Sequence, residues 1–539
     1  MTGAVVDVVI AGGGPNGLML ACELSLAGVR PVVLERLAER SAEPKANGLI
    51  GQVVQLLDHR GLYERFRGEA GPPQPLPAFM FGALPLDLAR LGNHPMYGLG
   101  IPQRRLEQLL EERARELGVE LRRGHELLTL AQDEDAGTDT GTVALEVRGP
   151  DGDYALAARY LVGCDGGHST VRKQAGIGFP GVTASDIVSR SAHVTIPGSE
   201  QVPGTTDLEV PGAGRLGLYA WHRTERGAYA VLPLDSGVLA VSCMEWGGPA
   251  ADDDSPMSVG ELREGLRRVY GADIPLHAPT TPGPHLLRRM SGRNTRLAET
   301  YRKGRVLLVG DAAHVHSAVG APGLNLGLQD AADLGWKLAT EVRGTAPAGL
   351  LDSYHAERHP VAERVTLHSQ AQLALMAPGE GVTALRAVFG ELLADEGSLR
   401  RIAELMAGAE VRRAAGATAV DGAAPHPLVG RFAPDLAVRT RSGTTRLAAL
   451  MRGARPLLLD LDGRHDLRAV VEEGWPDRVD TVAASCPDRN PPAAALLIRP
   501  DGKVAWAAPA AIASPDGAGR QRDALQHALT ASFGDPLTP

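Results

Sequence analysis

Residues 5–35 read VVDVVIAGGGPNGLMLACELSLAGVRPVVLE, and this stretch decides the fold of the N-terminal region. Residues 5–11 are an almost continuous apolar run, which is typical of a strand buried on both faces of a parallel sheet. Helical spacing covers residues 16–27, Gly28 is a helix stop signal, and residues 31–35 have the pattern of a second strand. The stretch therefore predicts a strand, a glycine turn, a helix and a parallel second strand.

The glycine turn matches the pattern G-x-G-x-x-G and predicts a dinucleotide site. Residues without Cβ let the turn tighten and let a pyrophosphate approach the backbone N–H groups of the helix N-terminus, where the helix dipole favours negative charge. The acid that ends the second strand can accept hydrogen bonds from ribose hydroxyls. A chance glycine-rich turn is the competing interpretation, but it leaves the ordered strand, turn, helix, strand and acid unexplained. The motif assigns to the cofactor site Gly12, Gly14, Pro15, Asn16, Gly17, Glu35 and Arg36.

The composition is that of an ordinary globular enzyme with more than one domain. The chain has 539 residues, with 55 Lys and Arg against 64 Asp and Glu, a formal net charge of −9 that argues against nucleic acid as the main partner. The four cysteines show no disulfide framework or zinc spacing. The N-terminus has no signal-peptide pattern, and no apolar run has the length of a membrane span, so we expect a cytoplasmic protein without a membrane partner.

Two later segments resemble the fingerprints of a known flavoprotein family. Residues 163–172 read GCDGGHSTVR, and residues 310–314 read GDAAH after a strand-like run over residues 305–309. With the glycine turn, and in this order, they resemble the DG and GD fingerprints of the class A FAD-dependent aromatic hydroxylases, the para-hydroxybenzoate hydroxylase family. The resemblance covers about residues 5–370. It implies FAD as the cofactor, because an NAD dehydrogenase would not require the second and third segments.

The resemblance also implies roles for individual residues. Asp311 matches the aspartate that binds the ribityl chain of FAD, with Gly310 before it, and Asp165 lies in the segment near the pyrophosphate and the nicotinamide path. The loop after residue 314 backs the isoalloxazine in this family, and the helix that follows stabilises negative charge on the flavin. This loop adds to the predicted cofactor site Gly320, Pro322, Gly323, Leu324 and Asn325.

Two stretches depart from the family pattern. The family often reads Pro-Pro-x-Gly-Gly-Gln-Gly before the asparagine, whereas residues 317–323 here read SAVGAPG. Relatives commonly place arginines within residues 44–52, where Lys45 is the one comparable charge of this chain. Gln103, at the start of a helix predicted over residues 104–117, matches a family glutamine that contacts FAD. The adenine end of the site therefore follows the family, and the ring end does not.

The sequence predicts an α/β protein with an inserted sheet domain and a C-terminal domain. Residues 1–180 and 291–416 form the Rossmann-like, glutathione reductase-type FAD-binding domain with a helical segment. Residues 181–290 form an antiparallel-sheet domain for the substrate, because short β-like runs alternate there with Gly and Pro. Residues 414–427 are the predicted linker, and residues 425–539 resemble the thioredoxin-like extension of larger family members. Cys486 is the only cysteine of that extension, which excludes thiol–disulfide exchange and leaves packing or dimerisation.

Three further groups of residues carry chemistry that the motifs do not use. His314 and His316 lack a third ligand and are predicted to be structural, so no metal is expected. Tyr219, Trp221 and His222 are candidates to line a substrate pocket, and for Tyr219 and Trp221 core packing of a sheet face is the alternative. The third group is interpreted as solvated surface and not as an NADPH phosphate site: Arg288, Arg289 and Arg293.

The predicted activity is that of an NAD(P)H- and O2-dependent FAD monooxygenase acting through a flavin C4a-hydroperoxide. The resemblance to polyketide hydroxylases of antibiotic biosynthesis implies hydroxylation or oxidative rearrangement of a polycyclic aromatic compound. No side-chain catalyst is predicted, since the flavin supplies the reactivity. The alternatives are a monooxygenase that inactivates an antibiotic such as rifampicin, a flavin-binding protein without turnover, and a flavin halogenase, which the absence of a WxWxIP-like segment disfavours. A homodimer is the expected assembly.

Overall fold

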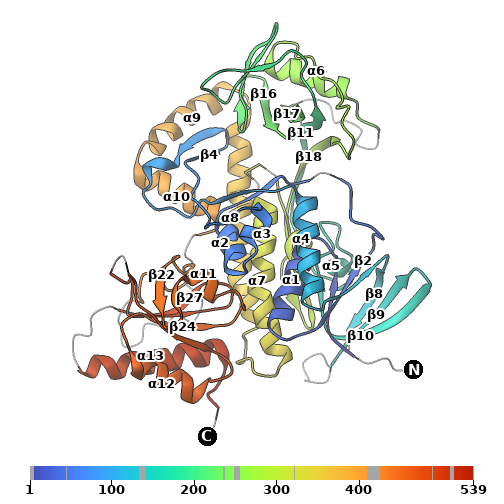
Figure 1. Cartoon of the computed structure of the whole chain (residues 1–539). Coiled ribbons are helices and arrows are strands. Elements are labelled where there is room, and N and C mark those ends of the chain that lie inside the picture. Colours follow the sequence, from blue (N-terminus) through green and yellow to red (C-terminus); the bar gives the residue numbers. More distant parts are fainter. Residues whose placement is uncertain are drawn as a thin grey trace.

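The structure is a computed structural model that describes residues 5–43, 45–132, 141–234, 237–247, 255–317, 319–320, 322–409, 425–487, 490–509 and 515–537. Figure 1 shows three bodies: a central one that carries most of the N-terminal half, a green sheet above it, and a red C-terminal unit below. In the described part of the chain, no helix combines the length and the apolarity that a membrane crossing requires.

The central body is built on an eight-stranded sheet in which β1 pairs in parallel with β2 and β10, and β10 with β20. The order is β19-β20-β10-β1-β2-β7, and the antiparallel strands β8 and β9 continue from β10. The predicted α/β class is confirmed. The strands are β1 Val6–Ala11, β2 Pro31–Glu35, β7 Glu120–Arg123, β8 Glu126–Gln132, β9 Val143–Gly149, β10 Gly152–Gly163, β19 Arg302–Lys303 and β20 Val306–Leu308.

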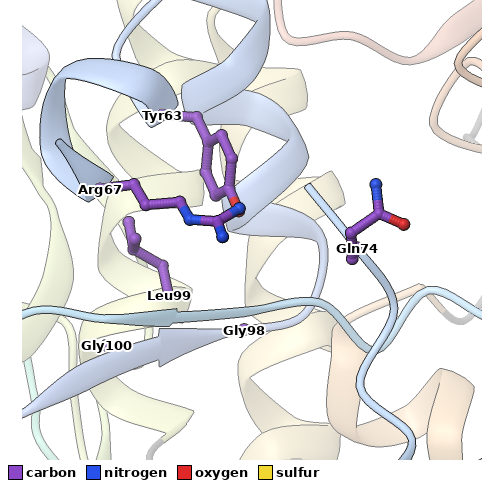
Figure 2. A pocket seen from close by; sticks show the side chains of 6 residues that line it. All are labelled: Tyr63, Arg67, Gln74, Gly98, Leu99 and Gly100. Carbon is purple, nitrogen blue, oxygen red and sulfur yellow. The ribbon is translucent and has the colours of Figure 1, made fainter. Parts of the chain in front are cut away.

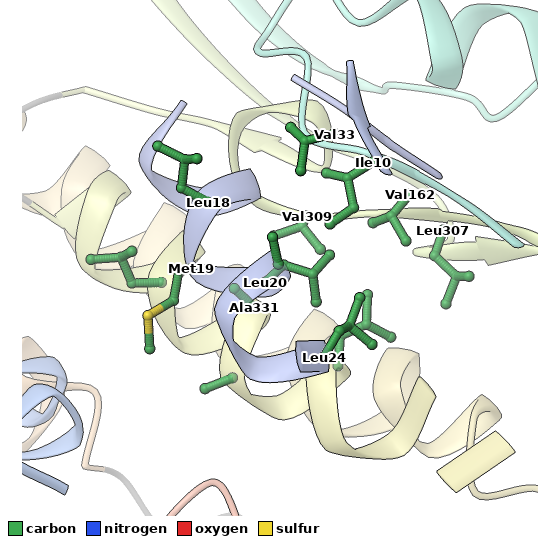
Figure 3. Close-up of a cluster of buried hydrophobic side chains, with 14 of the residues drawn as sticks. Ile10, Leu18, Met19, Leu20, Leu24, Val33, Val162, Leu307, Val309 and Ala331 are labelled. Carbon is green, nitrogen blue, oxygen red and sulfur yellow. The ribbon is translucent and has the colours of Figure 1, made fainter. Parts of the chain in front are cut away.

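Helices cover this sheet, and α1 packs against both α4 and α7. Helix α1 begins at Pro15, whose fixed φ and missing N–H suit the first helical position. Leu20 and Leu24 of α1 belong to one buried cluster with Ile10 and Val162 of the sheet, which Figure 3 shows from close by. The helices are α1 Pro15–Leu26, α4 Gln103–Glu116, α5 Thr170–Gln174, α7 Pro322–Val342 and α8 Asp352–Met376.

A second sheet of six antiparallel strands stands above the central body in the order β15-β16-β17-β11-β18-β21. Helix α6 (Val259–Tyr270) packs on one of its faces over a buried apolar cluster. Strand β18 runs to Leu297, beyond the residue at which the sequence places the end of this domain. The strands are β11 Gly181–Val194, β15 Trp221–Arg223, β16 Gly227–Pro233, β17 Leu239–Trp246, β18 Leu287–Leu297 and β21 His314–Val315; β12 Glu200–Gln201, β13 Leu208–Val210 and β14 Gly214–Leu216 form a small sheet beside them.

A helical lobe with two short ribbons lies between the sheets. The ribbons pair β3 with β6 and β4 with β5, and α8, α9 and α10 pack around them. The elements are β3 Gly48–Ile50, β6 Gly98–Gly100, β4 Ala78–Phe81, β5 Leu84–Asp87, α2 Gln52–His59, α3 Tyr63–Arg67, α9 Glu380–Leu393 and α10 Glu396–Ala407.

The C-terminal unit has a four-stranded sheet in the order β25-β24-β26-β27, with β24 and β25 parallel and the other pairs antiparallel. This order and these directions are those of a thioredoxin-like sheet. Of the linker predicted at 414–427, residues 414–424 lie outside the described residues. The elements are β22 Ala437–Thr440, β23 Gly443–Arg446, α11 Leu447–Leu450, β24 Leu457–Asp460, α12 His465–Gly474, β25 Asp480–Ala483, β26 Ala495–Ile498, β27 Val504–Ala508 and α13 Pro515–Phe533.

Candidate active site

The three sequence motifs meet at one edge of the eight-stranded sheet. Strand β1 ends just before Gly12, β2 ends at Glu35, β10 ends just before the segment of Asp165, and β20 ends just before Gly310. These strands are parallel, so their carboxyl ends share an edge, which is where open α/β sheets bind ligands.

The glycine turn is shaped by close backbone contacts. A Cβ at position 12 would collide with the carbonyl oxygen of Cys164, and one at position 17 would collide with the carbonyl oxygen of Gly12. Gly12 also has φ +112°, which side chains rarely adopt. At Gly14, the N-cap of α1, a Cβ would meet no protein atom within 4 Å. The turn therefore needs glycine at 12 and 17 for the protein itself, and position 14 leaves the helix N-terminus open to a ligand.

Glu35 is held by the turn that it faces. Its Oε2 accepts a hydrogen bond from the N–H of Gly13 at 2.7 Å, and its Oε1 accepts one from the N–H of Leu37 at 2.9 Å. Both oxygens keep a second lone pair for a ribose hydroxyl. Arg36 is exposed beside it.

Asn16 joins the glycine turn to the other motifs. A Cβ on Gly310 or on Gly327 would collide with its side-chain amide, so the turn, the GD segment and α7 all meet at this residue. Its Oδ1 is buried and has no hydrogen-bond partner among the described residues. The pattern included Asn16 and Gly310 but not Gly327, whose only sequence signal is a glycine in a helix.

Asp165 caps helix α5. Its Oδ2 accepts hydrogen bonds from the N–H groups of Thr170 at 2.7 Å and Val171 at 3.1 Å. Its Oδ1 is buried without a partner among the described residues. Arg172, which the motifs did not single out, is buried and donates to Ala312 O at 2.8 Å and to Gly167 O at 2.9 Å, and so ties the DG segment to the GD segment.

Asp311 lies near enough to Lys45 for the lysine charge to act on its carboxyl. The residue is accessible to solvent, yet surrounding protein raises the pKa of its carboxyl above the ordinary value, while the charges of His314 and Lys45 act to lower that pKa. Gln103 begins α4 next to the same segment, because its N–H donates to Ala46 O at 2.8 Å. Lys45, Gln103 and Asp311, far apart in the sequence, are therefore brought to one place.

The loop before α7 is held by α8 and β3. Gly320 has φ +79°, and a Cβ there would press on the amide of the buried Gln372. Pro322 is the first residue of α7, a position that tolerates its missing N–H, so the departure from the family glutamine is compatible with the helix start. Asn325 Oδ1 accepts a hydrogen bond from Ile50 N–H at 3.2 Å. Gly323 and Leu324 lie in the first turn, whose N–H groups give this end its positive character.

The two histidines of this region have protein partners. His314 Nε2 lies 2.7 Å from Asp330 Oδ2, and both side chains are fully buried. His316 Nδ1 lies 3.0 Å from Ser317 O, which places the proton on Nδ1, and its Nε2 is buried without a partner among the described residues. Within the described residues no three His, Cys, Asp or Glu side chains form a group that could hold a metal.

One face of the six-stranded sheet meets the loop before α7. This face, which we call the loop-facing side, carries residues that pair with one another across β18, β11, β17, β16 and β15. They are Arg288, Ser191, Ser242, Ala230 and Trp221 in one row, and Met244 and Ala228 in the next. Met244 and Ala228 belong to a buried cluster with Val319 of the loop and Met376 of α8, and Trp221 packs against it. The row itself has small, half-buried side chains between Arg288 and Trp221.

The structure corrects the interpretation of Arg289 and shows where Tyr219 and His222 lie. Arg289 is not solvated surface, since it is largely buried and forms a 2.6 Å ion pair with Glu261 of α6. Arg288 lies 3.3 Å from Glu43, and nothing is described for the side chain of Arg293. His222 stacks on Tyr229 over the α6 side of the sheet, opposite to Trp221, because neighbouring side chains of a strand point to opposite faces. Tyr219 is 60% exposed and therefore not packed in a core.

A pocket elsewhere does not compete with this site. It has a volume of about 390 Å³ and lies between α3 and the β3–β6 ribbon, where Figure 2 shows Tyr63 and Arg67 above Gly98. None of the predicted cofactor residues lines it. The motif residues, in contrast, fit a dinucleotide with a flavin. They provide an open helix N-terminus at Gly14, an acid at Glu35, two buried acceptors that bond to none of the described residues, and the positive end of α7.

The comparisons with known proteins agree with this geometry. Residues 5–369 match a family model described as an FAD binding domain, and residues 426–536 match one described as aromatic-ring hydroxylase, C-terminal. The chain is 41% identical over 538 residues to 12-dehydrotetracycline 5-monooxygenase/anhydrotetracycline 6-monooxygenase of Streptomyces rimosus subsp. rimosus, covering 98% of this chain and 99% of the relative. It is 40% identical over 501 residues to rifampicin monooxygenase of Streptomyces venezuelae, covering 93% and 95%.

A solved structure of similar size has the same fold throughout. It is that of an anhydrotetracycline hydroxylase from Streptomyces rimosus, with a TM-score of 0.82 and 39% identity over 99% of this chain and 100% of that chain. The similarity thus includes the C-terminal unit as well as the two sheets.

Proposed function

Because this chain belongs to the family of FAD-dependent aromatic-ring hydroxylases, we propose that it adds one oxygen atom from O2 to a flat polycyclic aromatic polyketide of the tetracycline kind. The chain is an FAD-dependent aromatic monooxygenase that acts on a small aromatic molecule. In such a reaction NAD(P)H supplies two electrons, one oxygen atom enters the substrate and the other leaves as water. The bound FAD receives the electrons and activates O2.

Different residues of the chain would bind different parts of the cofactor. The N-terminus of α1 at Gly14 and Pro15 would face the pyrophosphate, and Glu35 would accept a ribose hydroxyl. Asp311, on which the charge of Lys45 acts, would bind the polyol chain. The first turn of α7 would stabilise negative charge on the reduced ring. These assignments rest on the motifs and on their meeting at one sheet edge.

The substrate would bind between the loop-facing side of the six-stranded sheet and the loop before α7. The observation that carries this assignment is that Met244 and Ala228 of the sheet share a buried cluster with Val319 of the loop. The neighbouring row has the small side chains of Ser191, Ser242 and Ala230, which leave space above the sheet. A flat ring system can lie in this space while apolar neighbours exclude water. The full-length relation to a tetracycline-pathway monooxygenase supports a fused-ring substrate.

The test combines product analysis with one variant. We expect the purified protein, supplied with FAD, NADPH and ¹⁸O2, to transfer one labelled oxygen atom to an anhydrotetracycline-type compound. Ala230→Phe fills space on the loop-facing side and should raise KM for fused-ring substrates strongly, while leaving FAD affinity unchanged. Ala155→Phe, an exposed strand position in the other sheet, is the control. No labelled product from any fused-ring phenol, with the flavin reduced normally, would remove the polyketide proposal.

A rifampicin-type activity is the second candidate, because the rifampicin monooxygenase relative is almost as similar. Parallel turnover of a rifamycin and an anhydrotetracycline decides between the two, and we expect the higher kcat/KM for the latter. The homodimer expected from the sequence stays a prediction, which light scattering of the FAD-loaded protein tests.

A further inference from the structure

The C-terminal unit is joined to the helices of the central body through a shared core. Trp336 of α7 lies in one buried apolar cluster with Leu458, Trp475 and Phe533 of the C-terminal unit. The rings of Trp336 and Phe533 are 6.0 Å apart between centroids. The unit is therefore packed against α7, the helix whose first turn belongs to the predicted flavin site.

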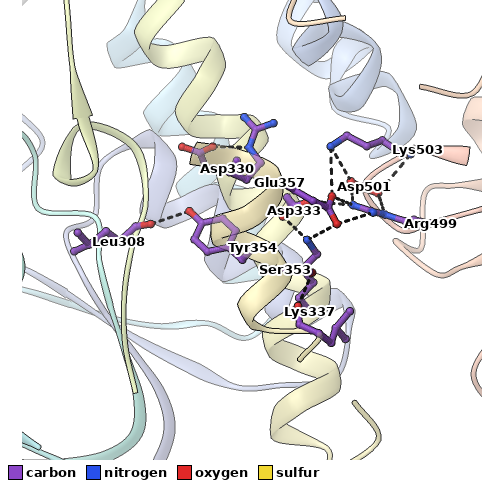
Figure 4. A network of polar contacts seen from close by, with 12 residues as sticks. Leu308, Asp330, Asp333, Lys337, Ser353, Tyr354, Glu357, Arg499, Asp501 and Lys503 are labelled. Atoms are coloured by element: carbon purple, nitrogen blue, oxygen red, sulfur yellow. Dashed lines mark hydrogen bonds and ion pairs between the residues drawn. The ribbon is translucent and has the colours of Figure 1, made fainter. Parts of the chain in front are cut away.

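Arg499 of this unit reaches into a network of buried charges on α7 and α8 (Figure 4). Its guanidinium lies 2.9 Å from Asp333 Oδ1, 2.8 Å from Glu357 Oε2 and 2.7 Å from Asp501 Oδ2, and its side chain is only 10% exposed. Lys337 of α7, which is fully buried, bonds the same two carboxylates of the helices at 2.9 and 3.1 Å. Burial alone would raise the pKa of Glu357, but Arg499 and the neighbouring lysines hold that pKa well below its ordinary value.

One turn earlier, α7 carries the contact to the GD segment. Asp330 is three residues before Asp333 and binds both His314 and Arg358 of α8, each at 2.7 Å. The two layers of buried ion pairs therefore lie in series along α7, from the C-terminal unit toward the helix N-terminus at Pro322. From Asp333 to Pro322 the helix rises only about 17 Å.

We propose that Arg499 is a positioning residue, through which the C-terminal unit sets the place of α7 and thereby of its N-terminus at the flavin ring. The apolar cluster around Trp336 alone would suffice for adhesion, and an apolar contact tolerates sliding. A planar guanidinium shared among three carboxylates fixes register, because it must face two different helices and its own strand ribbon at once. The proposal rests on the FAD site described above.

The experiment compares Arg499→Met with Arg455→Met, since Arg455 belongs to the same unit but makes an exposed ion pair with Asp480. Each variant is measured well below its melting temperature. For Arg499→Met we expect an FAD affinity about tenfold weaker than that of the wild type, which corresponds to about 1.4 kcal/mol. We also expect a lower midpoint potential of the bound flavin. Relative to the wild type, amide hydrogen exchange should speed up more in residues 322–333 than in residues 6–26. Arg455→Met should match the wild type in all three.

Arg499→Lys provides a second test of the proposal if the methionine variant does not fold. It retains the charge but loses the planar fork, so an intermediate FAD affinity and potential are expected. The proposal is overturned if either folded variant keeps wild-type potential and FAD affinity, or if exchange rises only within residues 425–537. A wild-type protein that cannot bind FAD would instead overturn the proposed function, so the two failures are distinguishable.

Discussion

His314 and Asp330 form a fully buried hydrogen bond of 2.7 Å between Nε2 and Oδ2. The other oxygen of Asp330 accepts a hydrogen bond from Arg358 at 2.7 Å. Burial would raise the pKa of this carboxyl, but Arg358 and His314 lower it overall. One carboxylate thus fastens the GD segment, which carries Asp311, to both α7 and α8.

Asp330→Asn should be among the most destabilising conservative changes in the chain. It leaves the buried guanidinium of Arg358 without its counter-charge, and such a loss typically costs about 3–5 kcal/mol of unfolding free energy. Asp352→Asn, which breaks the exposed pair with Arg302, should cost less than about 1 kcal/mol. Urea unfolding of the two proteins measures the difference. Equal losses would mean that the buried carboxylate does not hold the segment.

The glycines at positions 12 and 14 should respond differently to alanine. Gly12→Ala forces a Cβ onto the carbonyl of Cys164 and should lower the stability of the protein even without FAD. Gly14→Ala meets no protein atom within 4 Å, so the melting temperature of the FAD-free protein should barely change. If pyrophosphate approaches there, FAD affinity should nevertheless fall strongly. A Gly14→Ala protein with unchanged affinity would place the cofactor elsewhere.

Pro322 offers a test of the departure from the family pattern. Proline removes one backbone N–H from the first turn of α7. Both Pro322→Ala and Pro322→Gln restore it, and Pro322→Ala isolates its effect from that of the glutamine side chain. A gain of about 0.3–1 kcal/mol for the anionic reduced flavin is expected, seen as a higher midpoint potential. A gain with glutamine alone would mean that the side chain, and not the N–H, is what this chain lacks.

The elements that local patterns specify could be predicted from the sequence. Residues 31–35 form β2 as predicted, and the helix predicted over residues 16–27 is α1 Pro15–Leu26. The structure shows why the three motifs meet: the strands before them are parallel and share an edge. The alternation of side chains along a strand places Trp221 and His222 on opposite faces, which the sequence alone can indicate.

Contacts between distant elements could not be predicted in the same way. Arg289 was wrongly interpreted because the sequence does not show that α6 brings Glu261 against it. The bonds of Arg172 to the GD segment and of Arg499 to α7 depend likewise on how elements pack, not on spacing. Charged residues of this kind resemble solvated surface until their partners are known.

His316 should make the protein sensitive to mild acid. Burial, and then the nearby charges of His314 and His368, lower the pKa of His316 to about 4, whereas an unfolded histidine has a pKa of about 6.5. Between these values the unfolded chain binds a proton that the folded one does not. The contribution to stability is therefore fully present above pH 6.5 and is lost as the pH falls toward 4, by at most about 3 kcal/mol. His316→Gln should flatten the dependence of stability on pH in this window, measured by urea unfolding from pH 4 to 7.

His59, buried with a pKa lowered to about 3, contributes a similar slope, so His59→Gln in the same series separates the two. Because His316 precedes the loop that leads to α7, FAD release should also begin at a higher pH in the wild type than in His316→Gln. Identical pH profiles for stability and FAD release in the two proteins would show that His316 is not the titrating group.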